Sequence, residues 1–169
     1  MAKQEIGMTT TQGFVDPTVK TYTPLLSEVL TKVNNAKNKA QKVKILKEHD
    51  CLPLRQILIW AFDPNVESAL PEGRPPFIEN DAPEGTEHTT LRKEGDKLYY
   101  YVKGGMDSLQ SMKREQMFVQ LLEGLHETEA ELLVRTKDKK LHQVYKGLSK
   151  DVVKEAFDWN DEFVNPKLP

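Results

Sequence analysis

The chain has 169 residues, a formal net charge of −2 at pH 7 and a single cysteine. Its 38% hydrophobic content is enough for a folded core, and no apolar run approaches the roughly 18 residues of a membrane span, which excludes a disordered chain and a membrane-spanning helix. Cys51 has no second cysteine for an internal disulfide, and the first residues show no hydrophobic signal region, so we expect a soluble intracellular protein.

The N-terminal part of the chain predicts an arm followed by a helix. Residues 1–22 are polar and show no apolar periodicity, so we expect a flexible N-terminal arm. Thr23 and Pro24 are typical of a helix start, because Thr caps well and Pro loses no needed N–H at the first helical position. Apolar residues then follow at helical spacing as far as Val33, which predicts one buried face.

Two more helical patterns follow, and the first of them is basic. They cover 36–48 and 53–62, and the second stops at Asp63 because Pro64 disfavours helix in the residue before it. Six lysines occur between 32 and 47 with no acid among them: Lys32, Lys37, Lys39, Lys42, Lys44 and Lys47. Such a series suits a phosphate backbone or an acidic partner surface, and the alternative is a solvated helix face.

The middle of the chain predicts an irregular loop and then a β-hairpin. Residues 63–90 contain five prolines and seven acids against one arginine, which is typical of a long acidic loop. Two β-prone runs flank a turn at Gly95, so we expect an antiparallel hairpin over 89–102. The predicted fold class is therefore α+β: a mostly helical single domain over 23–157 with a small hairpin and a long acidic Pro-rich loop.

The C-terminal part predicts three helices and an aromatic tail. Apolar periodicity indicates helices over about 108–124, from about 127, and after a cap at Ser149. The tail, residues 158–169, is acidic and carries Trp159 and Phe163, four positions apart. One interpretation is a short peptide that docks on a partner, and the other is an extension of the last helix that folds back on the core.

Motifs that carry catalysis are missing from the sequence. There is no G-x-S-x-G, no phosphate-binding G-x-x-x-x-G-K-[ST], no G-x-G-x-x-G and no H-E-x-x-H. The four histidines, at 49, 88, 126 and 142, include no pair spaced by four residues. We therefore expect no catalytic residues, no metal site and no cofactor. An enzyme with a dispersed histidine and carboxylate site is the weakest alternative.

Several strings in the chain resemble a known group of proteins. They are LLEGLHETEAELL at 121–133, KDKK at 137–140 and YKGLSKDVVKEAF at 145–157, joined upstream by LRQIL and FDP between 54 and 64. Together they resemble an uncharacterised family of small proteins from contractile-tailed bacteriophages, mainly marine and cyanobacterial ones, over about 45–157. The resemblance implies a viral origin and carries over no activity and no site residue. The tail beyond residue 157 departs from the pattern.

These observations lead to three functional hypotheses. The preferred one is a non-enzymatic phage accessory protein that binds a phage or host protein, linked to phage DNA processing, in the cytoplasm of the infected bacterium. The second is a virion or assembly component, and the third is the dispersed-site enzyme. Nucleic acid is a weaker partner prediction, because the pI is near 6.1 and the lysine series has no interleaved aromatic residues. Opposed basic and acidic blocks also predict salt-sensitive self-association.

Overall fold

The computed structural model describes residues 23–80, 82–83 and 87–167, so the expected arm at 1–22 lies outside the described residues. The chain is helical over most of this length. In chain order the elements are α1 (Leu26–Asn35), α2 (Lys39–Glu48), α3 (Leu52–Phe62), α4 (Leu91–Glu94), the 3₁₀ helix η1 (Gly95–Tyr101), α5 (Ser111–Gly124), α6 (Glu127–Lys137), α7 (Leu141–Val144) and α8 (Lys150–Phe157).

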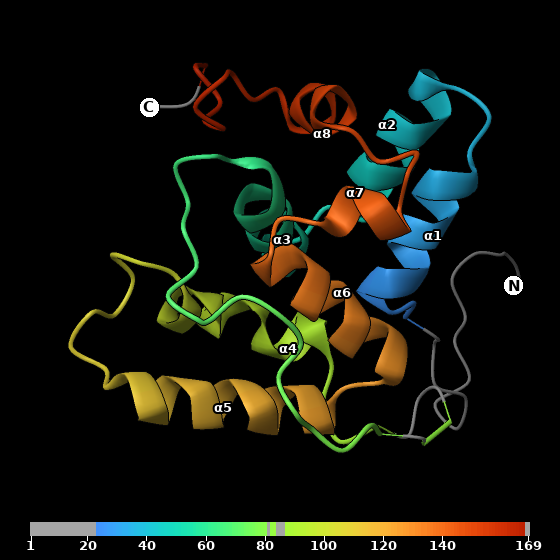
Figure 1. Cartoon of the computed structure of the whole chain (residues 1–169). Helices are drawn as coiled ribbons and strands as arrows, with labels where there is room; N and C mark the ends of the chain where they lie inside the picture. The colour runs from blue at the N-terminus through green and yellow to red at the C-terminus, as the bar shows by residue number, and fades with distance from the viewer. Residues whose placement is uncertain (1–22, 81, 84–86, 168–169) are drawn as a thin grey trace, which may run out of the picture.

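The helices are stacked from one end of the molecule to the other. Helices α2 and α8 pack on each other at one end, α5 lies along the opposite end, and α3 and α6 cross the space between them (Figure 1). Helix α1 packs against both α2 and α6, while α3 also packs on α4 and η1. This order leaves one face of α2 and one face of α5 at opposite ends of the molecule.

The predicted β-hairpin over 89–102 is wrong, and with it the α+β fold class. Residues 91–101 form α4 and η1, and the described residues contain no strand beyond a single bridge between Ser68 and Val102. Leu91, Leu98 and Tyr101 recur at helical spacing and are all buried. That apolar stripe outweighs the β propensity of the tyrosine run, because β propensity is a weak preference that tertiary packing overrides.

The helix starts are set by side chains that accept backbone N–H groups. Asn38 caps α2 through a 2.9 Å bond from the Gln41 N–H, and Ser149 caps α8, as its sequence predicts. Helix α1 begins at Leu26, later than the predicted Thr23–Pro24 start. Its first N–H donates to Glu129 of α6 at 3.0 Å, which supplies the cap from elsewhere in the chain.

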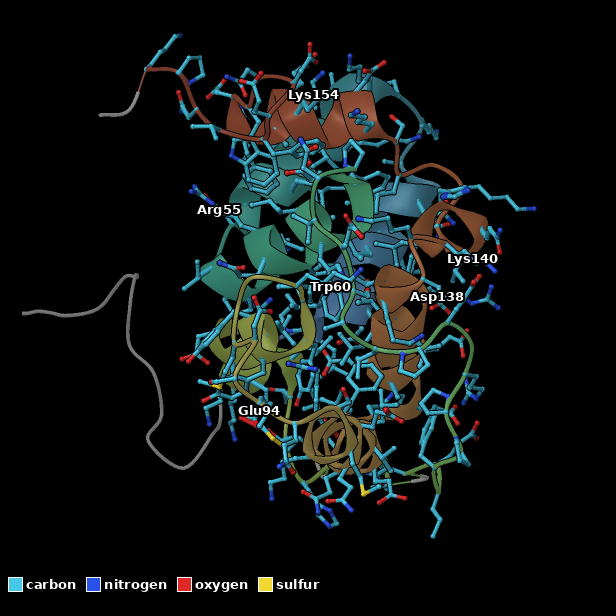
Figure 2. All side chains as sticks on the ribbon, turned by 60° about the vertical axis from the view of Figure 1, so that its left-hand side comes forward. Arg55, Trp60, Glu94, Asp138, Lys140 and Lys154 are labelled. Carbon is cyan, nitrogen blue, oxygen red and sulfur yellow. The ribbon has the colours of Figure 1, made fainter. Side chains whose placement is uncertain are left out.

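A polar connection ties the ends of α3 and α6 through the centre of the molecule. Trp60 of α3 lies in the middle of the structure, whereas Lys154 of α8 lies at one end (Figure 2). The Trp60 indole N–H donates to Ser68 Oγ at 2.9 Å, and that hydroxyl donates to the Lys137 carbonyl at 2.6 Å. Lys139 Nζ donates to the carbonyls of Trp60 and Asp63, so it satisfies the C-terminal end of α3. This connection fixes the start of the segment that borders the candidate site.

Candidate functional site

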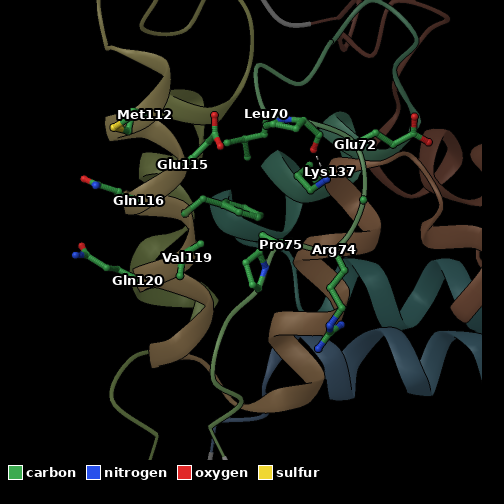
Figure 3. Close-up of a pocket in the computed structure, with 14 residues that line it drawn as sticks. Leu70, Glu72, Arg74, Pro75, Met112, Glu115, Gln116, Val119, Gln120 and Lys137 are labelled. Atoms are coloured by element: carbon green, nitrogen blue, oxygen red, sulfur yellow. Dashed lines mark hydrogen bonds between the residues drawn. The ribbon is translucent and has the colours of Figure 1, made fainter.

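A groove runs between α5 and the segment 70–76 (Figure 3). Met112, Glu115 and Val119 recur at helical spacing along α5 and line one wall of the groove. The segment opposite contains three prolines, at 71, 75 and 76, and Gly73 with a φ of 99°, so it cannot continue as a helix. The sequence therefore places an extended wall beside a helical one.

The groove is apolar inside and polar at its outer edge. Leu70 and Phe118 are buried and line its inner part, and the cavity has a volume of about 710 Å³. Glu115 faces Leu70 and Val119 faces Pro75 across the groove, whereas Gln116 and Gln120 line its outer edge on the same side of α5 as Met112 (Figure 3). Met112 is 73% exposed, although its helical spacing within 109–122 predicts a buried position. An apolar cavity of this size is in the range that ligands occupy in proteins.

A buried ion pair holds the extended wall in place. The Lys137 side chain is 1% exposed, and its Nζ donates to the Pro71 carbonyl at 2.8 Å and to the Asp138 carboxylate. The same carboxylate accepts the Gly73 N–H at 3.2 Å. A buried charge is tolerated when it is paired and hydrogen-bonded. The Lys137–Asp138 ion pair therefore holds the backbone of residues 71–73 in place. Lys137, which is part of a basic run in the sequence, is thus a structural group.

Arg74 fixes the end of the same wall. Its guanidinium donates to Glu131 of α6 at 2.5 Å and to Glu79 at 2.8 Å, and it lies 4.7 Å from the centre of the Phe77 ring. Burial alone raises the pKa of Glu131, but hydrogen bonds from Arg135 and Arg74 outweigh it and hold that pKa below its usual range. The Arg74 guanidinium therefore already has carboxylate partners within the chain.

The arrangement of the groove suits binding of an apolar group. Its cations, Lys137 and Arg74, are engaged by partners within the chain. Glu115 is exposed on the α5 wall, and Glu72 on the opposite wall is paired with Lys140 at 3.5 Å. Glu115 therefore places an acid at the border of an apolar interior, and this favours a ligand with apolar side chains and a positive flank.

The six lysines predicted as a contact surface are divided by the structure. Lys39 pairs with Glu155 of α8 at 3.1 Å, and Lys42 is half-buried. Four are exposed and have no ion pair among the described residues; we call them the lysine patch: Lys32, Lys37, Lys44 and Lys47. Two of the four, Lys32 and Lys44, line a shared hollow between α1 and α2. Of the six lysines predicted as a contact surface, the structure therefore leaves these four exposed and brings two of them to one hollow.

The two aromatic residues of the tail lie against α8. The chain turns at Asp158, whose φ of 55° ends the helix, so the tail does not extend α8. The Trp159 ring lies 4.7 Å from Phe157 and 5.8 Å from Phe163, and Phe163 is only 4% exposed. The tail thus folds back on the core, and partner docking through Trp159 and Phe163 stays a prediction.

The groove itself is not predicted by the sequence pattern. Its walls come from residues about 40 positions apart in the chain, and only the proline-rich composition of 70–76 and the apolar spacing on α5 could have drawn attention to them. Among the described residues, no three His, Cys, Asp or Glu side chains gather to hold a metal ion. Every helix in the same part of the chain is too short or too polar to cross a bilayer.

Comparison with known proteins gives one match. The model of a family of unknown function (DUF6433) matches residues 29–143, which is more than half of the chain. The matched region begins within α1 and ends within α7, so it contains both walls of the groove and the lysine patch but leaves out α8 and the tail. No curated protein and no solved structure matches the chain.

Proposed function

The chain belongs to a family of unknown function, DUF6433, and from the geometry of its surface we propose that it is a non-enzymatic binding protein. Its α5 groove holds a short segment of a protein partner that carries apolar side chains flanked by basic residues. The observation that carries this proposal is the apolar cavity of about 710 Å³, whose cationic wall residues are already occupied by their own chain.

The composition of the groove supports a peptide occupant. Met112 is 73% exposed at one end of the α5 wall, and Ile78, 80% exposed, follows the opposite wall. Large apolar side chains left on the surface beside an apolar groove are typical of interaction sites. The carboxylate of Glu115 at the border favours a basic flank on the partner and repels an acidic one.

The biological setting of the proposal comes from the resemblance of the C-terminal strings to phage proteins. On this basis the chain is an accessory protein of phage infection, and its partner is a phage or host protein in the infected bacterium. A virion or assembly component remains the alternative. Recovery of the chain in purified particles at a fixed, stoichiometric copy number would favour that alternative.

The proposal is tested by comparing partner recovery for matched surface variants. Tagged full-length chain, Met112→Glu and Leu52→Glu are purified from infected cells, and bound proteins are quantified by mass spectrometry. Met112→Glu places a charge at the edge of the groove, whereas Leu52→Glu changes a residue of α3 that is 55% exposed and lies outside the groove. We expect a partner that is recovered with the unsubstituted chain and Leu52→Glu and is reduced at least tenfold with Met112→Glu.

Two further variants separate the groove from other surfaces. Glu115→Lys reverses the charge on the α5 wall, and we expect it to weaken recovery of the same partner. Val164→Glu changes an exposed residue of the tail, so a loss seen only with this variant would place the contact on the tail. Equal recovery with Met112→Glu and Leu52→Glu would contradict the groove proposal.

A further inference from the structure

The lysine patch carries positive charge that the described chain does not neutralise. Its four side chains are exposed and lie on α1, on α2 and just before α2. The first turn of α2 contains no acid, although acids are favoured there by the helix dipole. The patch therefore places Lys37 just before the positive end of α2, and Lys44 and Lys47 in the second half of that helix.

The basic residues between 135 and 140 are engaged within the chain, and this contrast identifies the patch. Arg135 donates to Glu131 at 2.7 Å, Lys137 is paired with Asp138, and Lys140 pairs with Glu72. Lys139 donates to backbone carbonyls of α3. At the α1–α2 end, within the described ranges, the four lysines of the patch have no carboxylate partner.

Two lysines of the patch border a hollow between α1 and α2. Lys32 and Lys44 line it from opposite helices, and its volume is about 460 Å³. Asn35 and Gln41 add amide donors to the same hollow, and Glu48 is the acid that lines it. Thr31 also lines it, but its hydroxyl donates to the Ser27 carbonyl at 2.8 Å. Lysine, hydroxyl and amide donors are the side chains that proteins use on phosphate oxygens. The sequence spacing of 37, 41, 44 and 48 follows one face of a helix.

We propose that the lysine patch binds the phosphate backbone of a nucleic-acid duplex without reading its sequence. A protein partner is disfavoured because lysine is depleted in protein interfaces. A single strand is disfavoured because no aromatic side chain lines the hollow to stack on a base. Helix α2 spans about 15 Å, enough to face several successive phosphates.

The test is the salt dependence of duplex binding. Fluorescence anisotropy of a labelled 20-base-pair duplex is measured with the full-length chain between 50 and 200 mM NaCl. Four phosphate contacts predict a slope of log K against log[salt] of about −3.6, or about a 150-fold loss of affinity over this range. The double variant Lys32→Ala/Lys44→Ala removes two contacts, so we expect its slope to fall to about −1.8.

The control is a double variant of lysines outside the patch, Lys97→Ala/Lys113→Ala, which should keep the slope of the unsubstituted chain. Thermal melts of every variant verify that the chain stays folded. The proposal is overturned by no duplex binding at 50 mM NaCl, or by an equal loss in the control variant. Tighter binding of a single strand of the same length, or of poly-glutamate, would also overturn it in favour of a different partner.

Discussion

Glu129 joins two helices that are far apart in the sequence. Its side chain is completely buried, and its two carboxylate oxygens accept the Leu26 N–H of α1 and the Leu91 N–H of α4, each at 3.0 Å. Both donors are the first residue of their helix, so they have no partner within it. A single carboxylate thus satisfies the first N–H of each helix and holds α6 against both helix starts.

The burial of Glu129 predicts a pH-dependent stability. Burial raises the pKa of this carboxyl above its ordinary value of 4.5, while the two backbone donors act in the opposite direction. Above pH 4.5 the folded chain therefore binds more protons at this site than the unfolded chain does, and stability falls as the pH rises through the folded pKa. Glu129→Gln has no proton to lose. We expect the unsubstituted chain to lose free energy of unfolding, relative to Glu129→Gln, as the pH is raised from 4.5.

Urea denaturation at several pH values from 4 to 7 measures this difference. Glu127→Gln, on an exposed residue of the same helix, is the control and should follow the unsubstituted chain. Parallel profiles for the unsubstituted chain and Glu129→Gln would show that the pKa of Glu129 is not raised.

At the scale of elements, α4 and η1 owe their position to a close contact with α3. Gly95 is buried where the two short helices join, and a Cβ built on it would lie 2.3 Å from the Cβ of Pro53. Its φ of −63° suits any residue, so space alone requires glycine. The sequence pattern interprets this glycine as a turn residue, and only the contact across the fold shows why it is needed.

This contact predicts the outcome of Gly95→Ala. The added methyl must displace either Pro53 or the α4–η1 segment, and overpacking of this kind costs about 1–3 kcal/mol of unfolding free energy. Gly124→Ala is the matched control, because its added Cβ would meet nothing closer than the Thr89 side chain at 3.3 Å. Thermal or urea denaturation of the two variants gives the comparison. Equal stability of the two would contradict the packing argument.

The sequence predicts some features and misses others. The reason is how far apart along the chain the interacting residues lie. Helix α3 begins and ends close to its predicted limits, and α6 and α8 begin where they are predicted, because apolar spacing, prolines and caps act within a few residues. The segment 89–102 was predicted wrongly because its burial depends on α3. The groove needs the segment 70–76 to lie beside α5, and no local signal specifies this.

At the scale of the molecule, the structure assigns different roles to the charged blocks that nearly cancel in the net charge of −2. Carboxylates of the 63–90 segment pair within the chain: Glu67 with Lys103 at 3.1 Å, Glu79 with Arg74 and Glu72 with Lys140. The lysine patch lies at the α2 end, and the groove lies beside α5 at the opposite end (Figure 1). A duplex and a partner segment could thus bind without overlap.

The same distribution sets the strength of the predicted self-association. Contact between the lysine patch of one copy and the acidic segment of another must compete with the ion pairs that this segment already makes, and exposed ion pairs are each worth only about 0–1 kcal/mol. We therefore expect association only at low ionic strength, and its loss as screening increases. Sedimentation velocity at 20 and 300 mM NaCl measures it, and Lys32→Ala/Lys44→Ala should sediment as the smaller species at both concentrations. A particle size that does not change with salt would mean that the charged blocks are solvated.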